Sequence, residues 1–422
     1  MTGVQSNREN IDVPGKTPCD VATATASPSA IARLCGRPVS MSPLLLRAVV
    51  YGLAAVQIAQ GLRHPANDFV KSYWLIDYHE GFLRRGLAGQ TLDLVVGQPT
   101  RTATVVAGYA VAAVSIGAVL LVIELLIRKR TQACALLALL IAASPFVLDQ
   151  LAYHRRPDQL GFTLLVVTVF GITRAEKRPL LFLAAAGSGF AILCLVHEGV
   201  ALYYLPFAMA VTVLARADIS VRPRALTSLL TLCLPSVIVC AFLLTRTPKP
   251  GTAQRLRSHS AFTVDGDTMF DYIDKHASQS VLEIRDTSAT AIAVMVVMGV
   301  ALLALHFALV RWRCGTELFI ALRRTTNSRA QTLACGALGL GYLATFMLGI
   351  DWMRWFCIFG ACWLVCTAAL ALAGPSDKRA DNAGLTLPLW TLILLAYLAL
   401  LQPLSEVLGT KQGAFYPFDL LP

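Results

Sequence analysis

The sequence predicts an all-α protein that crosses a membrane about eleven times, and three observations lead to this fold class. Of the 422 residues, 56% are hydrophobic and only 14% are charged, whereas soluble proteins carry about 25% charged residues. The mean hydropathy is +0.62. Apolar stretches long enough for a transmembrane helix, which needs about 20 residues, recur along the chain. This composition excludes the ordinary classes of soluble enzyme.

The apolar stretches follow one another from residue 43 to residue 403. Before them, residues 1–42 are rich in Ser, Thr, Pro and Ala and lack periodicity, so we expect a disordered cytoplasmic tail. Residues 404–422 are expected to form an extracytoplasmic tail, because an odd number of spans places the two termini on opposite sides. The expected spans are 43–61, 103–127, 132–149, 159–173, 179–196, 200–215, 226–245, 289–310, 332–350, 355–373 and 385–403.

The distribution of basic residues predicts the orientation of these spans. In short loops, Lys and Arg collect on the cytoplasmic side, and a cytoplasmic N-terminus puts most basic clusters there. The two long outer loops, 62–101 and 246–288, are discounted by the same rule. We therefore expect an integral membrane protein whose N-terminus is cytoplasmic and whose C-terminus is extracytoplasmic. The cytoplasmic clusters are Arg128-Lys129-Arg130, Arg174/Lys177/Arg178, Arg216/Arg222/Arg224, Arg311/Arg313/Arg323/Arg324/Arg329 and Lys378/Arg379.

The formal net charge of +11 does not predict a nucleic-acid partner. The basic residues are scattered between apolar stretches and form no stripe or patch. Most of the eleven cysteines lie within apolar stretches and no CxxC pair indicates zinc, so we interpret them as small buried hydrophobes. No nucleotide-binding motif occurs. No motif indicates a cofactor, and a divalent cation is left open.

The outer loop 62–101 carries acidic groups followed by two adjacent arginines and an apolar-faced stretch. We expect that stretch to form a helix lying along the membrane interface. Arginine forks match phosphate oxygens, and a helix N-terminus favours anions, so the arginines could bind a phosphate group. The alternative is contact with lipid headgroups. The acidic groups, the histidine and the paired arginines on which this interpretation rests are Asp68, Asp77, His79, Glu80, Arg84 and Arg85.

Three further polar clusters are predicted to reach the same membrane face. Polar groups at helix mouths are costly and by default mark a functional site, so we expect one shared outer vestibule. The alternatives are ion pairs within the first and third clusters and a solvated hairpin tip for the second. The loop 246–288 would be either a lid over this vestibule or a solvated loop. The clusters are His154-Arg155-Arg156 with Asp158, His197-Glu198, and Asp351 with Arg354.

This layout resembles the GT-C superfamily of membrane glycosyltransferases, which use polyprenyl-phosphate-linked sugars at the extracytoplasmic face. The resemblance rests on a cytoplasmic N-terminus, an acidic loop after the first span and arginine-bearing outer loops. The patterns GFLRRGLAG, RRPD, HEG and DWMRW also resemble a bacterial family of multi-span proteins. One departure is that no adjacent acidic pair follows the first span, since Asp68 stands alone and Asp77 and Glu80 are separated.

The resemblance implies an enzyme that transfers sugar to a glycan or lipid-linked acceptor in cell-envelope polysaccharide synthesis. Asp77, or else Asp68 or Glu80, would deprotonate the acceptor hydroxyl. Two other functions stay open: a secondary transporter, which needs ionisable groups near mid-membrane, and an acyl or phospho-group transferase with His197 or His154 as base. In the glycosyltransferase, Arg84, Arg85, Arg155, Arg156 and Arg354 would hold the donor phosphate, and His154, Asp158, His197, Glu198 and Asp351 would complete the vestibule.

Overall fold

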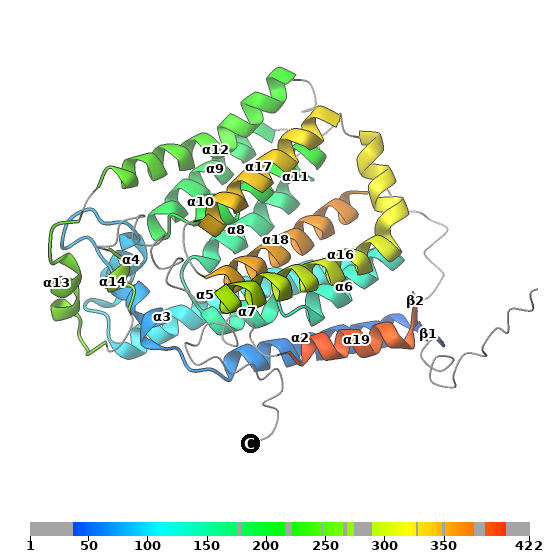
Figure 1. Cartoon of the computed structure of the whole chain (residues 1–422), viewed down its shortest axis with the longest axis horizontal. Helices are drawn as coiled ribbons and strands as arrows, with labels where there is room; N and C mark the ends of the chain where they lie inside the picture. Colours follow the sequence, from blue (N-terminus) through cyan, green and yellow to red (C-terminus); the bar gives the residue numbers. More distant parts are fainter. Residues whose placement is uncertain are drawn as a thin grey trace, which may run out of the picture.

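The computed structural model describes residues 37–174, 179–215, 222–246, 248–264, 268–273, 289–325, 328–347, 351–374 and 385–401. In these ranges the chain forms a bundle of helices with one two-stranded sheet (Figure 1). Each stretch predicted as a span contains one or two of the bundle helices. They are α2 (Pro43–Leu62), α5 (Arg101–Lys129), α6 (Gln132–Ala143), α7 (Leu148–His154), α8 (Gln159–Ile172), α9 (Pro179–Val196), α10 (Val200–Tyr203), α11 (Leu205–Ala215), α12 (Arg222–Leu244), α16 (Ala289–Thr325), α17 (Ser328–Met347), α18 (Trp352–Ala373) and α19 (Leu389–Ala399).

The described helices are long and apolar enough for a membrane. Seven segments meet the length and composition of a membrane span, and four further apolar helices have 10–17 residues. One of the seven, Gln132–His154, joins α6 and α7. The chain is therefore a polytopic, all-α integral membrane protein, as its composition predicts.

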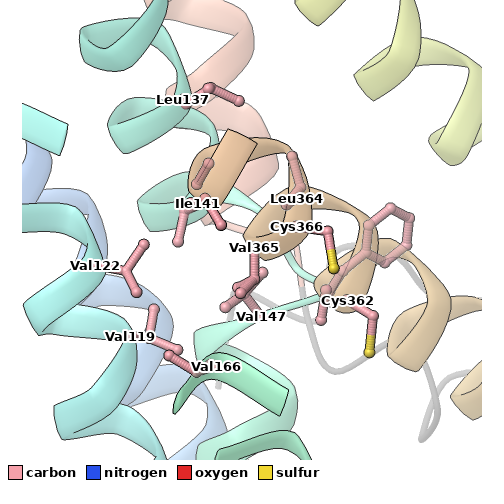
Figure 2. Packing of buried hydrophobic residues seen from close by; sticks show 14 of the residues in the cluster. Val119, Val122, Leu137, Ile141, Val147, Val166, Cys362, Leu364, Val365 and Cys366 are labelled. Carbon is pink, nitrogen blue, oxygen red and sulfur yellow. The ribbon is translucent and has the colours of Figure 1, made fainter. Parts of the chain in front are cut away.

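Helix α6 lies at the centre of the hydrophobic core. Its residues from Cys134 to Ala143 are buried, and it contacts α2, α5, α16, α18 and α19. Figure 2 shows Ile141 of α6 in one cluster with Val122 of α5 and Val365 of α18. Because α6 is apolar on every side, it is stable only where other helices surround it. The bundle is therefore built around this helix.

The two ends of the bundle carry different structures (Figure 1). One end, called the loop end below, bears several short helices. The opposite end bears β1 (Pro38–Met41) and β2 (Leu385–Pro388) together with Arg128 and Lys129 at the end of α5. The short helices of the loop end are α3 (Asp68–Ser72), η1 (Tyr73–Leu75), α4 (Gly86–Val96), α13 (Thr252–His259) and α14 (Phe270–Ile273).

Residues 38–41 depart from the disordered tail that the sequence predicts for 1–42. They form β1, which pairs antiparallel with β2 so that Met41 lies opposite Leu385. The partner strand comes from the far end of the sequence, so no local pattern could indicate it. Ser42 then caps α2 by accepting a hydrogen bond from the Leu45 N–H at 3.2 Å. Residues 1–36 and the predicted tail 404–422 lie outside the described residues.

The helix predicted in the loop 62–101 forms as α4. One of its faces packs so closely on the preceding loop that a Cβ at Gly89 would lie 2.1 Å from the Ile76 carbonyl oxygen. Its C-terminal turn exposes Leu94, Val95 and Val96, with Leu94 78% exposed. An exposed apolar turn beside a buried face is the pattern of a helix that lies against an apolar phase.

We expect Gly187→Ala to destabilise the bundle. A Cβ at Gly187 of α9 would lie 2.6 Å from the Leu232 carbonyl oxygen and 2.7 Å from that of Thr231, both in α12. The two helices would have to separate, which should cost about 1–3 kcal/mol and lower the Tm measured in detergent micelles.

The matched control is Gly117→Ala in α5, where a new Cβ meets nothing within 4 Å. Alanine favours a helix over glycine by up to about 1 kcal/mol, so this Tm should stay level or rise. Equal Tm losses for both variants would contradict close α9–α12 packing.

Candidate functional site

All the predicted site residues lie in the segments that form the loop end of the bundle (Figure 1). The structure does not bring them into one cavity. Asp77 and Glu80 line an open pocket, whereas most of the arginines belong to a network of ion pairs and hydrogen bonds packed below it. The predicted single vestibule is thus divided into two parts.

The open part, called the carboxylate pocket below, has a volume of about 550 Å³. Small-molecule sites have about 300–1,000 Å³, so this pocket is large enough for a ligand. Its walls come from three segments: the loop around η1, the helix α4 and the residues following it, and α13 with the residues following it. The lining residues are Trp74, Leu75, Asp77, His79, Glu80, Gly89, Asp93, Gln98, Pro99, Leu256, Ser258, Ser260 and Ala261.

Asp77 and His79 form a hydrogen-bonded acid–base pair in this pocket. The Nδ1 of His79 lies 2.9 Å from Oδ2 of Asp77, and the His79 backbone N–H donates to the other carboxylate oxygen at 3.0 Å. The hydrogen bond to Asp77, with the charge of that carboxylate, raises the pKa of His79 above 6.5. The imidazole is 61% exposed, and its Nε2 lies 4.0 Å from Oδ2 of Asp93. An oriented imidazole therefore stands open to a ligand.

The other two predicted carboxylates differ from Asp77. Glu80 lines the pocket but forms an ion pair with Arg255 of α13. Asp68 is not in the lining, and its carboxylate bonds Nζ of Lys71 at 2.7 Å. Of the three predicted carboxylates, Asp77 is thus the one that lines the pocket and is paired there with an imidazole.

Below the pocket, Arg85 binds Glu198 at the turn between α9 and α10. The Nε of Arg85 lies 2.9 and 3.1 Å from the two carboxylate oxygens. Burial acts to raise the pKa of Glu198, but the charge and hydrogen bonds of Arg85, together with the other positive groups around it, outweigh burial and lower the pKa. Arg85 itself has φ 66°, a left-handed conformation that is uncommon outside glycine. The pair fixes the start of α4 on the α9–α10 turn.

His197 is buried next to this pair, with 4% of its surface exposed, and does not line the carboxylate pocket. Its Nδ1 accepts a hydrogen bond from the Gly199 N–H at 3.0 Å, so the neutral ring carries its proton on Nε2. Burial, assisted by the charge of Arg85, lowers the pKa of His197 to about 4. The ring lies between Tyr73 and Tyr203, 6.0 Å from each. His197 is therefore a neutral packing residue at pH 7.

A second, fully buried ion pair joins Arg354 of α18 to Asp158 at the start of α8. The two side chains are 7% and 0% exposed. Burial acts to raise the pKa of Asp158, but Arg354 and the other groups that stabilise the carboxylate, among them Arg156, together outweigh burial and lower the pKa. Asp351 lies 3.5 Å from Arg354 and 3.8 Å from Arg156. The residues predicted to line a vestibule wall thus form ion pairs with one another. The buried pair of Asp158 and Arg354, called the charged joint below, connects α8 to α18.

Four of the five arginines predicted to hold a donor phosphate donate hydrogen bonds to protein groups. Arg85 and Arg354 bind carboxylates. Arg84 donates to the carbonyls of Tyr272 and Ile273, and Arg155 donates to the Tyr109 hydroxyl and the His64 carbonyl.

Arg156 differs from the other four arginines. Its guanidinium lies over the rings of Phe69 and Tyr73, 4.8 and 5.6 Å from their centroids. No described residue accepts a hydrogen bond from it. Its nearest anionic partner among these residues is Asp351, at 3.8 Å. Arg156 is thus the predicted arginine whose N–H groups have no hydrogen-bond acceptor among the described residues.

The sequence did not single out Asp93, Trp74, Ser258 of α13 and Ser260, which follows α13, as pocket residues. Gly86, Gly89 and Asp93 are spaced three and four residues apart, which places them on one helix face and could have indicated Asp93. The serines Ser258 and Ser260 come from a segment remote in sequence, so no signal was available for them. Among the described residues, no group of three or more His, Cys, Asp or Glu is placed to hold a metal ion.

The described part of the loop 246–288 packs on the loop end and is not simply a solvated loop. Met269, Phe270 and Ile273 are buried, and the Met269 N–H donates to the Ser72 hydroxyl at 2.8 Å. The sequence predicts these three residues, together with Leu282, as the apolar face of a lid, and Leu282 lies outside the described residues. The segment forms one wall of the carboxylate pocket through α13.

Comparison with known proteins gives a family and distant relatives. A family described as "Uncharacterised membrane protein Rv1490" matches residues 44–259. "Uncharacterized protein Rv1490" of Mycobacterium tuberculosis and "Uncharacterized protein Mb1527" of Mycobacterium bovis are 26% identical over 186 residues. The match covers 43% of this chain and 42% of each relative, so less than half of the relatives' length is spanned. No solved structure matches.

We expect Arg354→Met to lower the free energy of unfolding by about 3–5 kcal/mol, because it leaves the Asp158 carboxylate buried without its cation. The double variant Asp158→Leu/Arg354→Met should recover most of this loss, since apolar side chains of similar volume replace the pair. Denaturation of the full chain in micelles measures both.

Acid provides a second readout of the same pair. Because the Asp158 pKa lies below its ordinary 3.8, the pair stabilises the fold above that pH and loses its contribution as the pH falls through the lowered pKa. The Tm of the native chain should therefore fall further in strong acid than that of the double variant. A single variant as stable as the native chain would show that the pair does not join α8 to α18.

Proposed function

The chain belongs to the family described as uncharacterised membrane protein Rv1490, and we propose that it is a membrane glycosyltransferase resembling the GT-C superfamily. It would move a sugar from a polyprenyl-phosphate-linked donor to a glycan or lipid-linked acceptor. The carboxylate pocket carries this proposal, because it combines a ligand-sized cavity with an acid–base pair at one end of a membrane bundle.

We place the loop end on the extracytoplasmic side of the bacterial inner membrane. The seven long segments and the four shorter apolar helices would together give eleven spans. The basic residues Arg128, Lys129 and Arg174 end helices at the opposite end of the bundle, which the positive-inside rule assigns to the cytoplasm. The carboxylate pocket would then face the compartment in which lipid-linked sugars are consumed.

In this proposal the Asp77–His79 pair activates the acceptor. Neutral His79 takes the proton of the acceptor hydroxyl on Nε2, while Asp77 holds the ring through Nδ1. The hydroxyl oxygen forms a bond to the anomeric carbon of the donor sugar. The bond from that carbon to the phosphate oxygen breaks, and its electron pair leaves on the polyprenyl phosphate.

Arg156 is our candidate for contact with the donor phosphate. Its open donors match a phosphate group, and its side chain is held in place by Phe69 and Tyr73. Tyr73 and Trp74 are consecutive residues of η1, so one short helix supports Arg156 and also contributes to the pocket wall. The other four predicted arginines would instead hold the segments around the site in place. They are Arg84, Arg85, Arg155 and Arg354.

An acyl or phospho-group transferase is a second candidate, and the same observation favours it. An imidazole oriented by a carboxylate is also the base needed to activate a nucleophile for acyl transfer. The base would be His79, since His154 and His197 are buried.

We expect His79→Gln and Asp77→Asn to lower the rate of sugar transfer by about 10²–10⁴-fold, the usual contribution of general base catalysis. The assay uses the purified full chain in liposomes with radiolabelled polyprenyl-phosphate sugars and cell-envelope acceptors. Asp68→Asn is the matched control, because this carboxylate lies outside the pocket lining, and it should leave the rate near native. Native rates for both pocket variants would contradict the assigned roles, and acyl transfer without sugar transfer would favour the second candidate.

The pH dependence identifies the base. His79 accepts a proton only when neutral, so kcat/KM should rise as the pH increases through its raised pKa. In Asp77→Asn the cause of the raised pKa is removed, and the residual activity should rise at a lower pH. The ion pair itself stabilises the fold below pH 6.5 and loses its contribution as the pH rises through that pKa.

A further inference from the structure

A second, small cavity adjoins the buried pair of Asp158 and Arg354. Its volume is about 30 Å³, and a water molecule needs about 10–15 Å³ measured in this way. Its lining shares no residue with that of the carboxylate pocket. The lining residues that matter here are His154, Asp158, Gln159, Tyr204, Arg354 and Ala361.

Two buried oxygen atoms of these residues have no described donor. Oδ2 of Asp158 accepts from Arg354, but no described group donates to Oδ1. Likewise no described group donates to Oε1 of Gln159. The two residues are 0% and 6% exposed. Leaving a buried acceptor without a hydrogen-bond donor destabilises the fold, so a donor is needed at this position.

A flip of the Gln159 side-chain amide would not provide the missing hydrogen-bond donor. Its Nε2 donates to the carbonyl oxygens of Gln150 and Leu151, each at 3.2 Å. A flipped amide would place Oε1 against those two carbonyls and lose both hydrogen bonds. The two unsatisfied groups are therefore both acceptors, and neither can donate to the other.

We propose that this cavity binds one ordered water molecule, which donates its two hydrogens to Asp158 and Gln159. Water is the small neutral group that supplies two donors at once, and a water in such a site commonly makes about three hydrogen bonds. The water completes the solvation of a carboxylate that is removed from bulk solvent. It thereby supports the charged joint between α8 and α18, whatever reaction the protein performs.

Two isosteric substitutions at Ala361 of α18 test this proposal. Val and Thr have nearly the same shape, but the hydroxyl of Thr can donate to an acceptor in the place of the water and the methyl of Val cannot. Both variants of the full chain should lower the Tm, and the Thr variant should melt about 2–4 °C above the Val variant. If Val equals or exceeds Thr, the cavity is dry and the proposal is overturned.

A map of the native chain tests the proposal even if one of the two Ala361 variants fails to fold. A high-resolution cryo-EM map of the native chain in nanodiscs should show a density peak within hydrogen-bond distance of both the Asp158 and Gln159 side-chain oxygens. The double variant Asp158→Leu/Arg354→Met should lack this peak. A clear map without the peak in the native chain would overturn the proposal.

Discussion

The loop end of this protein depends on one constraint: a charge that is removed from water inside an apolar bundle must be neutralised where it lies. The Arg354–Asp158 pair shows the constraint most plainly, since its side chains are 7% and 0% exposed. Each partner alone would be strongly disfavoured at that depth. Together they join two helices, α8 and α18, whose residues are far apart in sequence.

The same constraint explains why most of the arginines brace the structure and are not open to a ligand. Arg85 connects the start of α4 to the α9–α10 turn by its hydrogen bonds to Glu198. Arg84 holds α14 in place by donating a hydrogen bond to the backbone carbonyl of Ile273. With these positions fixed, the loop around η1, α4 and α13 enclose a pocket that contains the Asp77–His79 pair. The arginine contacts thus fix the segments around an exposed acid–base pair, an arrangement suited to group transfer at a membrane surface.

The helices of the bundle could be predicted from the sequence, because a long apolar stretch specifies a membrane helix locally. The gathering of the polar clusters at one end of the bundle could also be predicted from the sequence, because successive spans cross the membrane in alternating directions. The pairing of Arg85 with Glu198 could not be predicted, since it depends on how α4 rotates against α9 and not on any local spacing. The same holds for β1, whose partner strand is supplied by residues 385–388, and for Ser258 and Ser260 in the pocket wall.

The central claim is that the loop end, with its carboxylate pocket, faces the extracytoplasmic side. Labelling of intact cells with a membrane-impermeant maleimide tests it most directly, using full-length Ser258→Cys and Arg174→Cys and the native chain as background. Ser258 is exposed in the pocket wall, and Arg174 is exposed at the opposite end of the bundle. We expect Ser258→Cys to be labelled on intact cells and Arg174→Cys only after lysis. The reverse pattern would put the pocket in the cytoplasm and contradict the claim.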